Sequence, residues 1–311
     1  MAQGAEPPVD PPAVAARGGA GRGADPRTGP GSAASPHRPG PSVGAASGTL
    51  EAAQVRAMFD RIAGVYDLIN GVMTAGLHHR WRERAVDLSG VGAGSRVLDV
   101  ATGTGDLALA LARRVAPGGE VIGSDFSQEM LARARRKTDA ERGRLAGWPK
   151  RGCPPQAGVS RRRSGFSTLA PVRFEWGDAL ALPYADDSFD AATVGFGARN
   201  FADLPRGLRE LARVVRPGGR VVVLEMTTPT RPPLSSFFAL WFDRVVPLLG
   251  RLAGDSAAYS YLPSSVKRWP APAILAGEME RSGLGEIGYL LTAGGIIAIH
   301  AGTVRPHDRR S

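Results

Sequence analysis

The stretch Val97–Asp106, VLDVATGTGD, decides the fold of this chain. An apolar strand pattern runs directly into a glycine-rich turn, and a helix pattern follows the turn. Such a turn brings backbone N–H groups and the positive end of a helix dipole close to a bound ligand. A second strand-like run ends at Asp125, about twenty residues further on, where a carboxylate holds ribose hydroxyls in nucleotide sites. The sequence therefore predicts a nucleotide-type pocket at the end of a sheet.

The turn reads Gly103-Thr104-Gly105 and follows a strand aspartate, Asp99, so it differs from the GxGxxG fingerprint of dehydrogenases. The pattern resembles motif I of the class I S-adenosylmethionine (SAM) methyltransferases. That resemblance implies that the turn lies under the methionine part of SAM and that Asp125 binds the ribose. Taken alone, the turn also fits a tight strand-to-helix connection that binds nothing.

A third pocket element is predicted after the strand 172–176, where Trp176-Gly177-Asp178-Ala179 leads into a loop. In SAM enzymes an acid or amide at the position of Asp178 contacts the adenine amino group, and Ala179 lies beside it. A turn with a capping aspartate is the alternative interpretation. The three elements together favour a SAM site.

Strand and helix patterns alternate from residue 96 to the end of the chain. Strands are predicted at 96–100, 120–124, 172–176, 189–195, 219–225, 286–291 and 295–303, and helices at 106–114, 128–137 and 204–213. Alternation favours a mostly parallel sheet, and Thr292-Ala293-Gly294 between the last two strands is typical of a hairpin. The prediction is an α/β, Rossmann-like fold of the class I SAM-methyltransferase type, with seven strands, mostly parallel, and a C-terminal antiparallel hairpin.

Composition sets the domain limits within the 311 residues. Residues 1–48 are rich in Pro, Gly, Ala and Arg and contain no aromatic residue, so a disordered N-terminal extension is expected. Residues 49–304 form the predicted methyltransferase domain, with a basic disordered insertion at about 138–171, and residues 305–311 are a basic tail.

The net charge of +10 raises the question of nucleic-acid binding. Seven basic against two acidic side chains within 138–171 supply five of these charges, in a segment whose Gly and Pro content favours a solvated loop. No specific nucleic-acid partner is therefore predicted. Cys153 is the only cysteine, which excludes an internal disulfide, and the pair His78-His79 has no clustered third ligand, so no metal is assigned. The chain has no apolar run of membrane-spanning length and no secretory signal, which predicts a cytoplasmic protein.

Two further stretches identify a family. Residues 59–67, FDRIAGVYD, form an amphipathic entry segment, and Gly195-Phe196-Gly197-Ala198-Arg199-Asn200 follows the fourth strand. Together with Val221–Met226 and Leu291–Gly295, they resemble the UbiE/MenG quinone C-methyltransferases from about Val55 to Thr303. The resemblance implies methyl transfer from SAM to a ring carbon of a polyprenylated quinol, with demethylmenaquinol favoured over a ubiquinone precursor. It places Thr104, Asp125, Asp178 and Ala179 on the cofactor.

The chemistry requires a quinol hydroxyl to lose its proton so that the ring carbon becomes nucleophilic, with carbon, methyl and sulfur held in line. Arg199 is the predicted stabiliser of the phenolate. Asn200 and Tyr66 are predicted to orient the quinol or a water, and Asp67 or a water accepts the proton. Three alternatives stay open: a core position for Tyr66, an Arg199–Asp203 loop ion pair, and a helix cap at Asn200. Many family members carry Ser where this chain has Gly195.

Competing functions are a nucleic-acid methyltransferase, a methyltransferase of another small phenol or sterol, and a catalytically silent SAM-binding protein. Amino-methylating DNA enzymes carry Asn/Asp-Pro-Pro-aromatic where this chain has GFGARN, and Cys153-Pro154 lies in the basic insertion rather than in an ordered nucleophile loop. The apolar segment Leu234–Leu249 is predicted either to contact the membrane surface or to form a lid on the sheet. The sequence does not predict the oligomeric state.

Overall fold

The computed structural model describes residues 77–146, 169–241, 244 and 263–306. The N-terminal extension, Tyr66, Asp67 and Cys153 lie outside this part of the chain. The same holds for most of the basic insertion, for 242–243 and 245–249 of the apolar segment, and for residues 307–311 of the basic tail.

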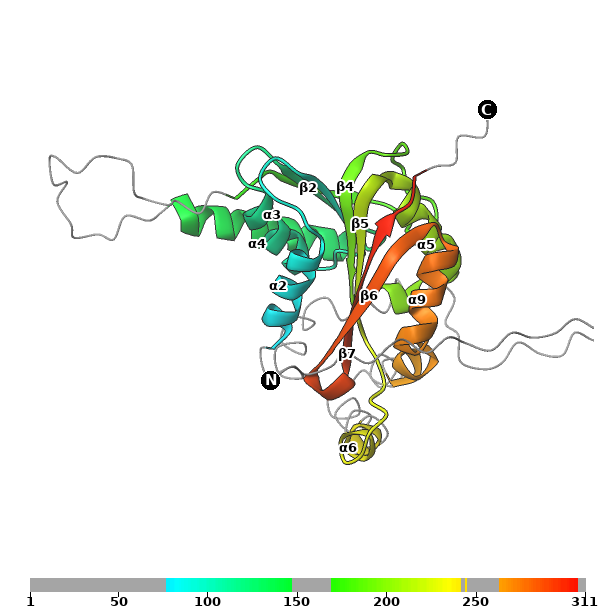
Figure 1. The fold of residues 1–311 in the computed structure, drawn as a ribbon. Helices are drawn as coiled ribbons and strands as arrows, with labels where there is room; N and C mark the ends of the chain where they lie inside the picture. Colours follow the sequence, from blue (N-terminus) through cyan, green and yellow to red (C-terminus); the bar gives the residue numbers. More distant parts are fainter. Residues whose placement is uncertain (1–76, 147–168, 242–243, 245–262, 307–311) are drawn as a thin grey trace, which may run out of the picture. The chain divides into compact units, whose positions relative to one another are not determined.

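Seven strands form one sheet, in the order β3-β2-β1-β4-β5-β7-β6 (Figure 1). The strands are β1 Arg96–Val100, β2 Glu120–Asp125, β3 Val172–Trp176, β4 Phe189–Gly195, β5 Val215–Met226, β6 Leu284–Thr292 and β7 Ile297–Val304. The first five pair in parallel, whereas β7 is antiparallel to both β5 and β6. The mostly parallel sheet with a C-terminal antiparallel hairpin is therefore confirmed.

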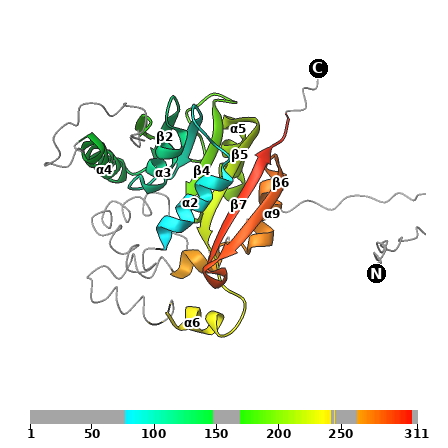
Figure 2. The same ribbon diagram turned by 60° about the vertical axis from the view of Figure 1, so that its left-hand side comes forward.

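Helices cover both faces of the sheet, with α2, α3 and α4 on one side and α5 and α9 on the other (Figure 1). Figure 2 shows α2 lying across the near face of the strands. The bounds are α2 His78–Leu88, α3 Asp106–Val115, α4 Gln128–Ala146, α5 Leu204–Val214, α6 Leu234–Leu240 and α9 Pro272–Arg281, with 3-10 turns η1 Ala198–Asn200 and η3 Ala293–Gly295.

Alternation along the central strands explains the two layers, because successive strand side chains point to opposite faces. In β1, Val97 packs into the core under α2 and α3, while Leu98 and Val100 pack into the core under α5 and α9. In β5, Val222 and Leu224 join the first core, and Val221 and Val223 join the second. Asp99 and Glu225 interrupt these apolar series, with 1% and 0% of their surfaces exposed.

Both predicted boundaries of the basic insertion are wrong. The helix predicted at 128–137 continues to Ala146, so residues 138–146 are helical rather than part of a disordered insertion. Their charges form ion pairs on exposed helix surface, such as those of Glu141 with Arg113 and Arg144, which a composition argument interprets as a solvated loop. At the other end of the predicted insertion, Ala170 is 3% exposed and its N–H donates to Ala112 O at 3.0 Å.

The strand predicted at 219–225 begins earlier, at Val215, so Pro217-Gly218-Gly219 lies inside β5. The pairing with β4 jumps from Val215 to Arg220 while β4 advances only from Phe189 to Ala191. Gly218 has a φ of +79°, which lets the extra residues bulge out of the ladder. β5 therefore pairs with β4 on both sides of this bulge.

The order of strands creates a switch point beside β1. The chain moves outward from β1 through β2 to β3 and then returns to β4 on the other side of β1. Ligands of open α/β sheets bind at the carboxyl ends of the strands at such a point. The glycine turn that follows β1 lies there.

Candidate active site

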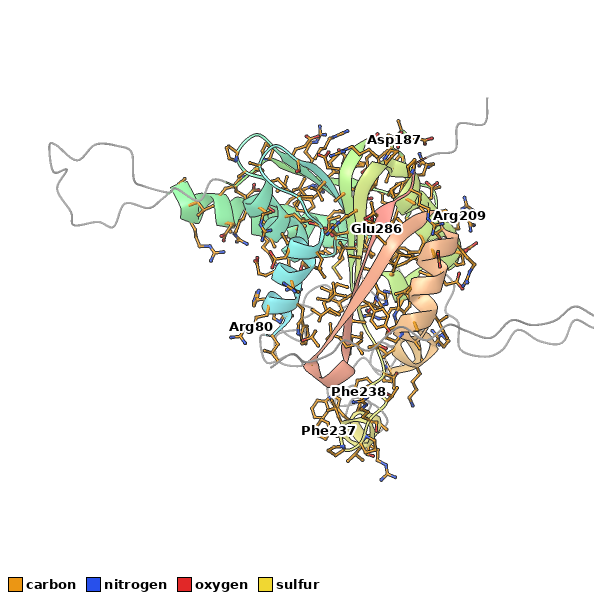
Figure 3. All side chains as sticks on the ribbon, viewed as in Figure 1. Arg80, Asp187, Arg209, Phe237, Phe238 and Glu286 are labelled. Carbon is orange, nitrogen blue, oxygen red and sulfur yellow. The ribbon has the colours of Figure 1, made fainter. Side chains whose placement is uncertain are left out.

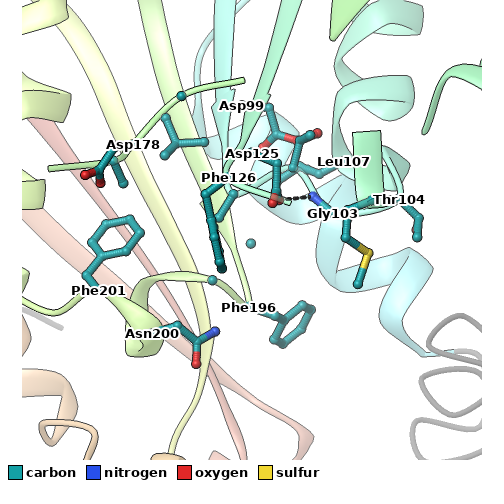
Figure 4. A pocket seen from close by; sticks show the side chains of 18 of the residues that line it. Asp99, Gly103, Thr104, Leu107, Asp125, Phe126, Asp178, Phe196, Asn200 and Phe201 are labelled. Carbon is teal, nitrogen blue, oxygen red and sulfur yellow. Dashed lines mark hydrogen bonds between the residues drawn. The ribbon is translucent and has the colours of Figure 1, made fainter. Parts of the chain in front are cut away.

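A pocket of about 310 Å³ opens at the carboxyl ends of β1, β2 and β4. Its wall contains the glycine turn, the end of β2, the loop after β3 and the segment Gly195–Ala202, apart from Ala198 and Arg199 (Figure 4). This volume lies in the range of small-molecule sites. Segments far apart in the sequence therefore meet at the switch point.

The glycine turn adopts backbone angles that require small residues. Gly103 and Gly105 have φ values of +56° and +84°. A Cβ atom on Gly105 would also lie 3.0 Å from Phe174 Cζ and 3.1 Å from Ala134 Cβ. The turn thus brings the first residues of α3 against β3 and α4, and it exposes backbone to the pocket.

Asp125 connects the end of β2 to this turn. Its Oδ2 accepts a hydrogen bond from Gly103 N at 2.8 Å, drawn in Figure 4, and its Oδ1 accepts one from Ser127 N at 2.9 Å. A carboxylate only accepts hydrogen bonds and offers about four lone-pair positions, which suits the hydroxyl donors of a ligand. The predicted juxtaposition of Gly103 and Asp125 is what the structure shows.

Asp99 is buried beneath the pocket and contributes to its wall. Its two carboxylate oxygens accept hydrogen bonds from the hydroxyls of Thr102 and Thr193, each at 2.7 Å. Burial raises the pKa of Asp99 to about 6, against the opposing effect of these hydrogen bonds. Asp99 is therefore a fixed hydrogen-bond acceptor at the pocket floor, and its pKa lies about one unit below neutral pH.

The adenine end of the predicted site lies in the loop after β3. Asp178 and Ala179 both line the pocket, and Asp178 Oδ1 accepts a hydrogen bond from Leu180 N at 2.9 Å. Two aromatic side chains that the sequence analysis did not select, Phe126 and Trp176, also line this end. The Trp176 indole donates to Phe126 O at 3.1 Å, which fixes one against the other. Phe126 directly follows Asp125 in the sequence, and this position beside a predicted site residue was the only sign that it would line the pocket.

Thr104 lies in the pocket wall but is only 4% exposed. Its hydroxyl accepts a hydrogen bond from Lys137 Nζ at 3.0 Å, and the same ammonium lies 2.8 Å from Asp106 Oδ1. Arg82 Nη2 reaches Asp106 Oδ2 at 3.0 Å. Sequence analysis missed this basic cluster at the start of α3, because its members come from α2, α3 and α4.

Arg199 does not line the pocket. Its guanidinium Nη1 donates to Glu225 Oε1 at 2.5 Å and to Phe196 O at 2.7 Å, and the side chains of Arg199 and Glu225 are 6% and 0% exposed. The alternative pair with Asp203 is wrong, because Asp203 caps α5 by accepting from Arg206 N. Glu225 was missed, although it is the lone acid in the apolar strand VVVLEM.

Asn200, in contrast, lines the pocket beside Phe196 and Phe201 (Figure 4). It does not cap α5, so that alternative is also wrong. Gly197 lets this segment pass close to the glycine turn, since a Cβ there would lie 2.4 Å from Ala101 Cβ. The structure thus brings Asn200 to the same pocket as Asp99, Gly103 and Asp125.

Comparison with known proteins decides the family. The model of the ubiE/COQ5 methyltransferase family matches residues 48–145 and 157–304. The chain belongs to this family. The protein is a SAM-dependent methyltransferase, and S-adenosylmethionine is its cofactor, as the sequence predicts.

Named relatives cover nearly the whole family region. A demethylmenaquinone methyltransferase of Thermus thermophilus is 46% identical over 246 residues, which are 79% of this chain and 99% of that protein. The ubiquinone/menaquinone biosynthesis C-methyltransferase UbiE of a Geobacter species is 36% identical over 250 residues, 80% of this chain and 96% of that protein.

The crystal structure of the [4+2]-cyclase SpnF resembles this fold with a TM-score of 0.56 at 19% identity, over 83% of this chain and 97% of that chain. At this level of identity the likeness concerns the fold alone.

Gly195 lines the pocket without a side chain. A Cβ there would lie 3.1 Å from Leu107 Cδ2 and would displace that side chain slightly. Within the described ranges, no group of three or more His, Cys, Asp or Glu side chains is arranged to hold a metal ion. No helix in the described part of the chain is long and apolar enough to cross a membrane.

Proposed function

We propose that this methyltransferase transfers the SAM methyl group to a ring carbon of a prenylated quinol, with demethylmenaquinol as the acceptor. The observation that carries the proposal is the pocket that joins the SAM motifs to the Gly195–Ala202 segment. Relatives named demethylmenaquinone methyltransferase, at 46%, 39% and 43% identity, support the naphthoquinol over the benzoquinol.

In this proposal the cofactor side is formed by Asp99, the turn Gly103-Thr104-Gly105, Asp125, Asp178 and Ala179. The turn supports the methionine part, Asp125 accepts from the ribose hydroxyls, and Asp178 accepts from the adenine amino group. Phe126 and Trp176 contribute apolar walls for the adenine ring. SAM supplies an electrophilic methyl group when bound, and these residues fix its direction.

On the acceptor side, Asn200 is proposed to hydrogen bond a quinol hydroxyl, because its side chain belongs to the pocket wall. Arg199 is proposed to act from beneath this wall. Its charge stabilises a developing phenolate, while its bonds to Glu225 and Phe196 O hold the segment that carries Asn200. Tyr66 remains a proposed partner of the quinol, although it lies outside the described residues.

Expression of the gene in bacteria that lack their own demethylmenaquinone methyltransferase tests the acceptor. We expect menaquinone to reappear in the quinone extract and the demethyl precursor to disappear, whereas the Arg199→Ala variant should leave the precursor in place. Persistence of the precursor with the wild-type protein expressed and folded would overturn the assignment.

The second proposal concerns α6, which we infer to contact the membrane surface where a prenylated substrate resides. Phe238 and Val266 are buried together, whereas Phe237 and Leu240 are 58% and 54% exposed (Figure 3). Exposed apolar side chains on a short helix are suited to the lipid interface.

Liposome flotation tests this role. The double variant Phe237→Ser, Leu240→Ser should bind liposomes less than the wild type, whereas Ile274→Ser on α9, where Ile274 is 57% exposed, should bind as the wild type does. Equal flotation of all three proteins would remove this role.

A further inference from the structure

Arg82 is a buried arginine on the helix that precedes β1. The neighbouring side chains Trp81, Ala85 and Val86 are buried under the sheet, so α2 is held firmly in place. Arg82 shares this buried face and lines the SAM pocket, with its side chain only 10% exposed. Its side chain therefore contributes to the pocket wall from a rigid support.

The hydrogen bonding of this guanidinium is incomplete. Nη2 pairs with Asp106 Oδ2 at 3.0 Å, but Nη1 is buried and has no hydrogen-bond acceptor among the described residues. An unpaired donor on a buried cation is energetically unfavourable, and native proteins rarely retain one without a purpose. A ligand anion in the pocket would supply the missing acceptor.

The charges around Arg82 favour an anion at this end of the pocket. Arg82 and Lys137 both pair with Asp106, so positive charge exceeds negative charge among these three side chains. Burial alone would raise the pKa of Asp106, but the charges of Arg82 and Lys137 lower it below its ordinary value. The partial positive charge of the α3 N-terminus adds to the same potential.

The rest of the pocket carries the opposite charge, from Asp99, Asp125 and Asp178. SAM has one anionic group, the α-carboxylate of its methionine part, and two cationic groups, the ammonium and the sulfonium. A pocket with a basic end and an acidic middle therefore selects one orientation of this zwitterion.

We propose that Arg82 binds the α-carboxylate of SAM through its guanidinium, whose Nη1 has no acceptor among the described residues, with Asp106 and Lys137 as positioning residues that fix it. Arginine suits this task because its planar donors match a carboxylate. The inference rests on the SAM cofactor of this methyltransferase and not on the identity of the methyl acceptor.

The test is a calorimetric binding experiment with two ligands, SAM and decarboxylated SAM, which lacks only the α-carboxylate. For the full chain, we expect Arg82→Met to weaken SAM binding by roughly 10- to 100-fold, the range for a lost hydrogen bond to a charged group. Decarboxylated SAM should bind the wild type weakly, and Arg82→Met should change that affinity less than about threefold.

Arg80→Met is the matched control, since Arg80 lies on the same helix with its side chain exposed and directed away from the sheet (Figure 3). It removes the same charge and should leave both affinities unchanged. Arg82→Lys should give an intermediate SAM affinity and keeps the test open if the Met variant fails to fold. Equal weakening of both ligands by Arg82→Met, or by Arg82→Lys in its place, would overturn the proposal, as would unchanged SAM binding. If the wild type bound no SAM, the assignment of SAM as cofactor would be wrong. An error in the proposed methyl acceptor would not change the result of this experiment.

Discussion

Glu225 and Arg199 form an ion pair in the interior, between the end of β5 and the 3-10 turn η1. Removing two charges from water carries a large desolvation penalty, which the mutual attraction and further hydrogen bonds must offset. Glu225 Oε1 also accepts from Met226 N at 2.9 Å, and Arg199 donates to Phe196 O. Buried ion pairs are often no more stabilising than apolar pairs of similar volume, so the effect of this pair is to order the Gly195–Ala202 segment of the pocket wall.

Glu225→Gln should reduce the free energy of unfolding by about 3 kcal/mol, because it leaves the buried Arg199 charge without its counterion. Urea unfolding measures this loss. The double variant Arg199→Met, Glu225→Leu should regain more than half of the free energy of unfolding that Glu225→Gln loses. It should still transfer no methyl group, because the proposed role of Arg199 needs its charge. Glu278→Gln, at an exposed ion pair with Arg281, is the control and should change stability by less than about 1 kcal/mol. If the double variant lost as much stability as the two single variants together, Arg199 and Glu225 would not be energetically coupled.

Asp99 gives the stability of this protein a defined pH dependence. Its ordinary pKa is 3.8, and burial raises the pKa in the folded protein to about 6. Between these values the folded state binds more protons than the unfolded state, so stability must fall as pH rises from about 4 to 6. The loss amounts to roughly 3 kcal/mol and is complete above the folded pKa.

Asp99→Asn should abolish this decline, since Asn does not titrate. His300 acts in the opposite direction, because burial lowers its pKa and stability is lost as pH falls below its ordinary value of 6.5. The difference between the wild-type and Asp99→Asn unfolding curves cancels that contribution. Denaturant midpoints at several values between about pH 4 and pH 7 measure it, and parallel curves would show that the Asp99 pKa is not raised.

Sequence reasoning selected those pocket residues whose signal is local. Asp99, Gly103, Asp125 and Asp178 each stand at or near the end of a strand, and the structure brings them to one pocket. Arg82 and Glu225 could not be found in this way, because each is defined by a partner on another element. A lone charge in an apolar pattern was the only signal available for Glu225.

In the turn between β1 and α3, one glycine is required both by the backbone conformation and by close packing. Gly105 combines a φ of +84° with close contacts to Phe174 and Ala134. Gly94 has a nearly identical φ of +85° but nothing within 4 Å of an added Cβ. The two glycines therefore separate the cost of the left-handed conformation from the cost of crowding.

Gly94→Ala should lower stability by about 1 kcal/mol through backbone strain and leave SAM affinity unchanged. Gly105→Ala should lower stability by about 1 kcal/mol more, and it should weaken SAM binding by roughly tenfold, because α3 must move away from Phe174. Thermal unfolding and calorimetric titration measure both effects. Equal stability losses, with SAM affinity retained in both variants, would show that the close contacts of Gly105 do not matter.

The starts of helices and strands were predicted correctly where a glycine or the beginning of an apolar pattern marks them in the sequence. The starts of β1, β2, β3 and β4 coincide with the predicted ones, as does the start of α3. The end of α4 was missed because a charged, exposed helix end has the composition of a loop, and its ion pairs with α3 are visible only in three dimensions. Composition therefore predicts solvent exposure better than it predicts backbone conformation.

At the scale of the whole molecule, the positive charge of the chain does not define its acceptor. Several arginines of the described part pair with acids on helix surfaces and at strand ends, such as Arg113 with Glu141 and Arg216 with Asp190. The pocket itself combines acidic and aromatic walls, which suit a nucleoside cofactor and an aromatic ring. The proposed quinol, rather than a nucleic acid, follows from the site and from the named relatives.

The decisive experiment measures methyl transfer from labelled SAM by the purified full chain, with demethylmenaquinol in detergent micelles and RNA as competing acceptors. We expect label on the quinone ring at a rate about 100-fold or more above that of the Arg199→Ala variant, which should still bind SAM within about threefold of the wild type. Label in RNA, or no label in the quinone from a protein that binds SAM, would contradict it.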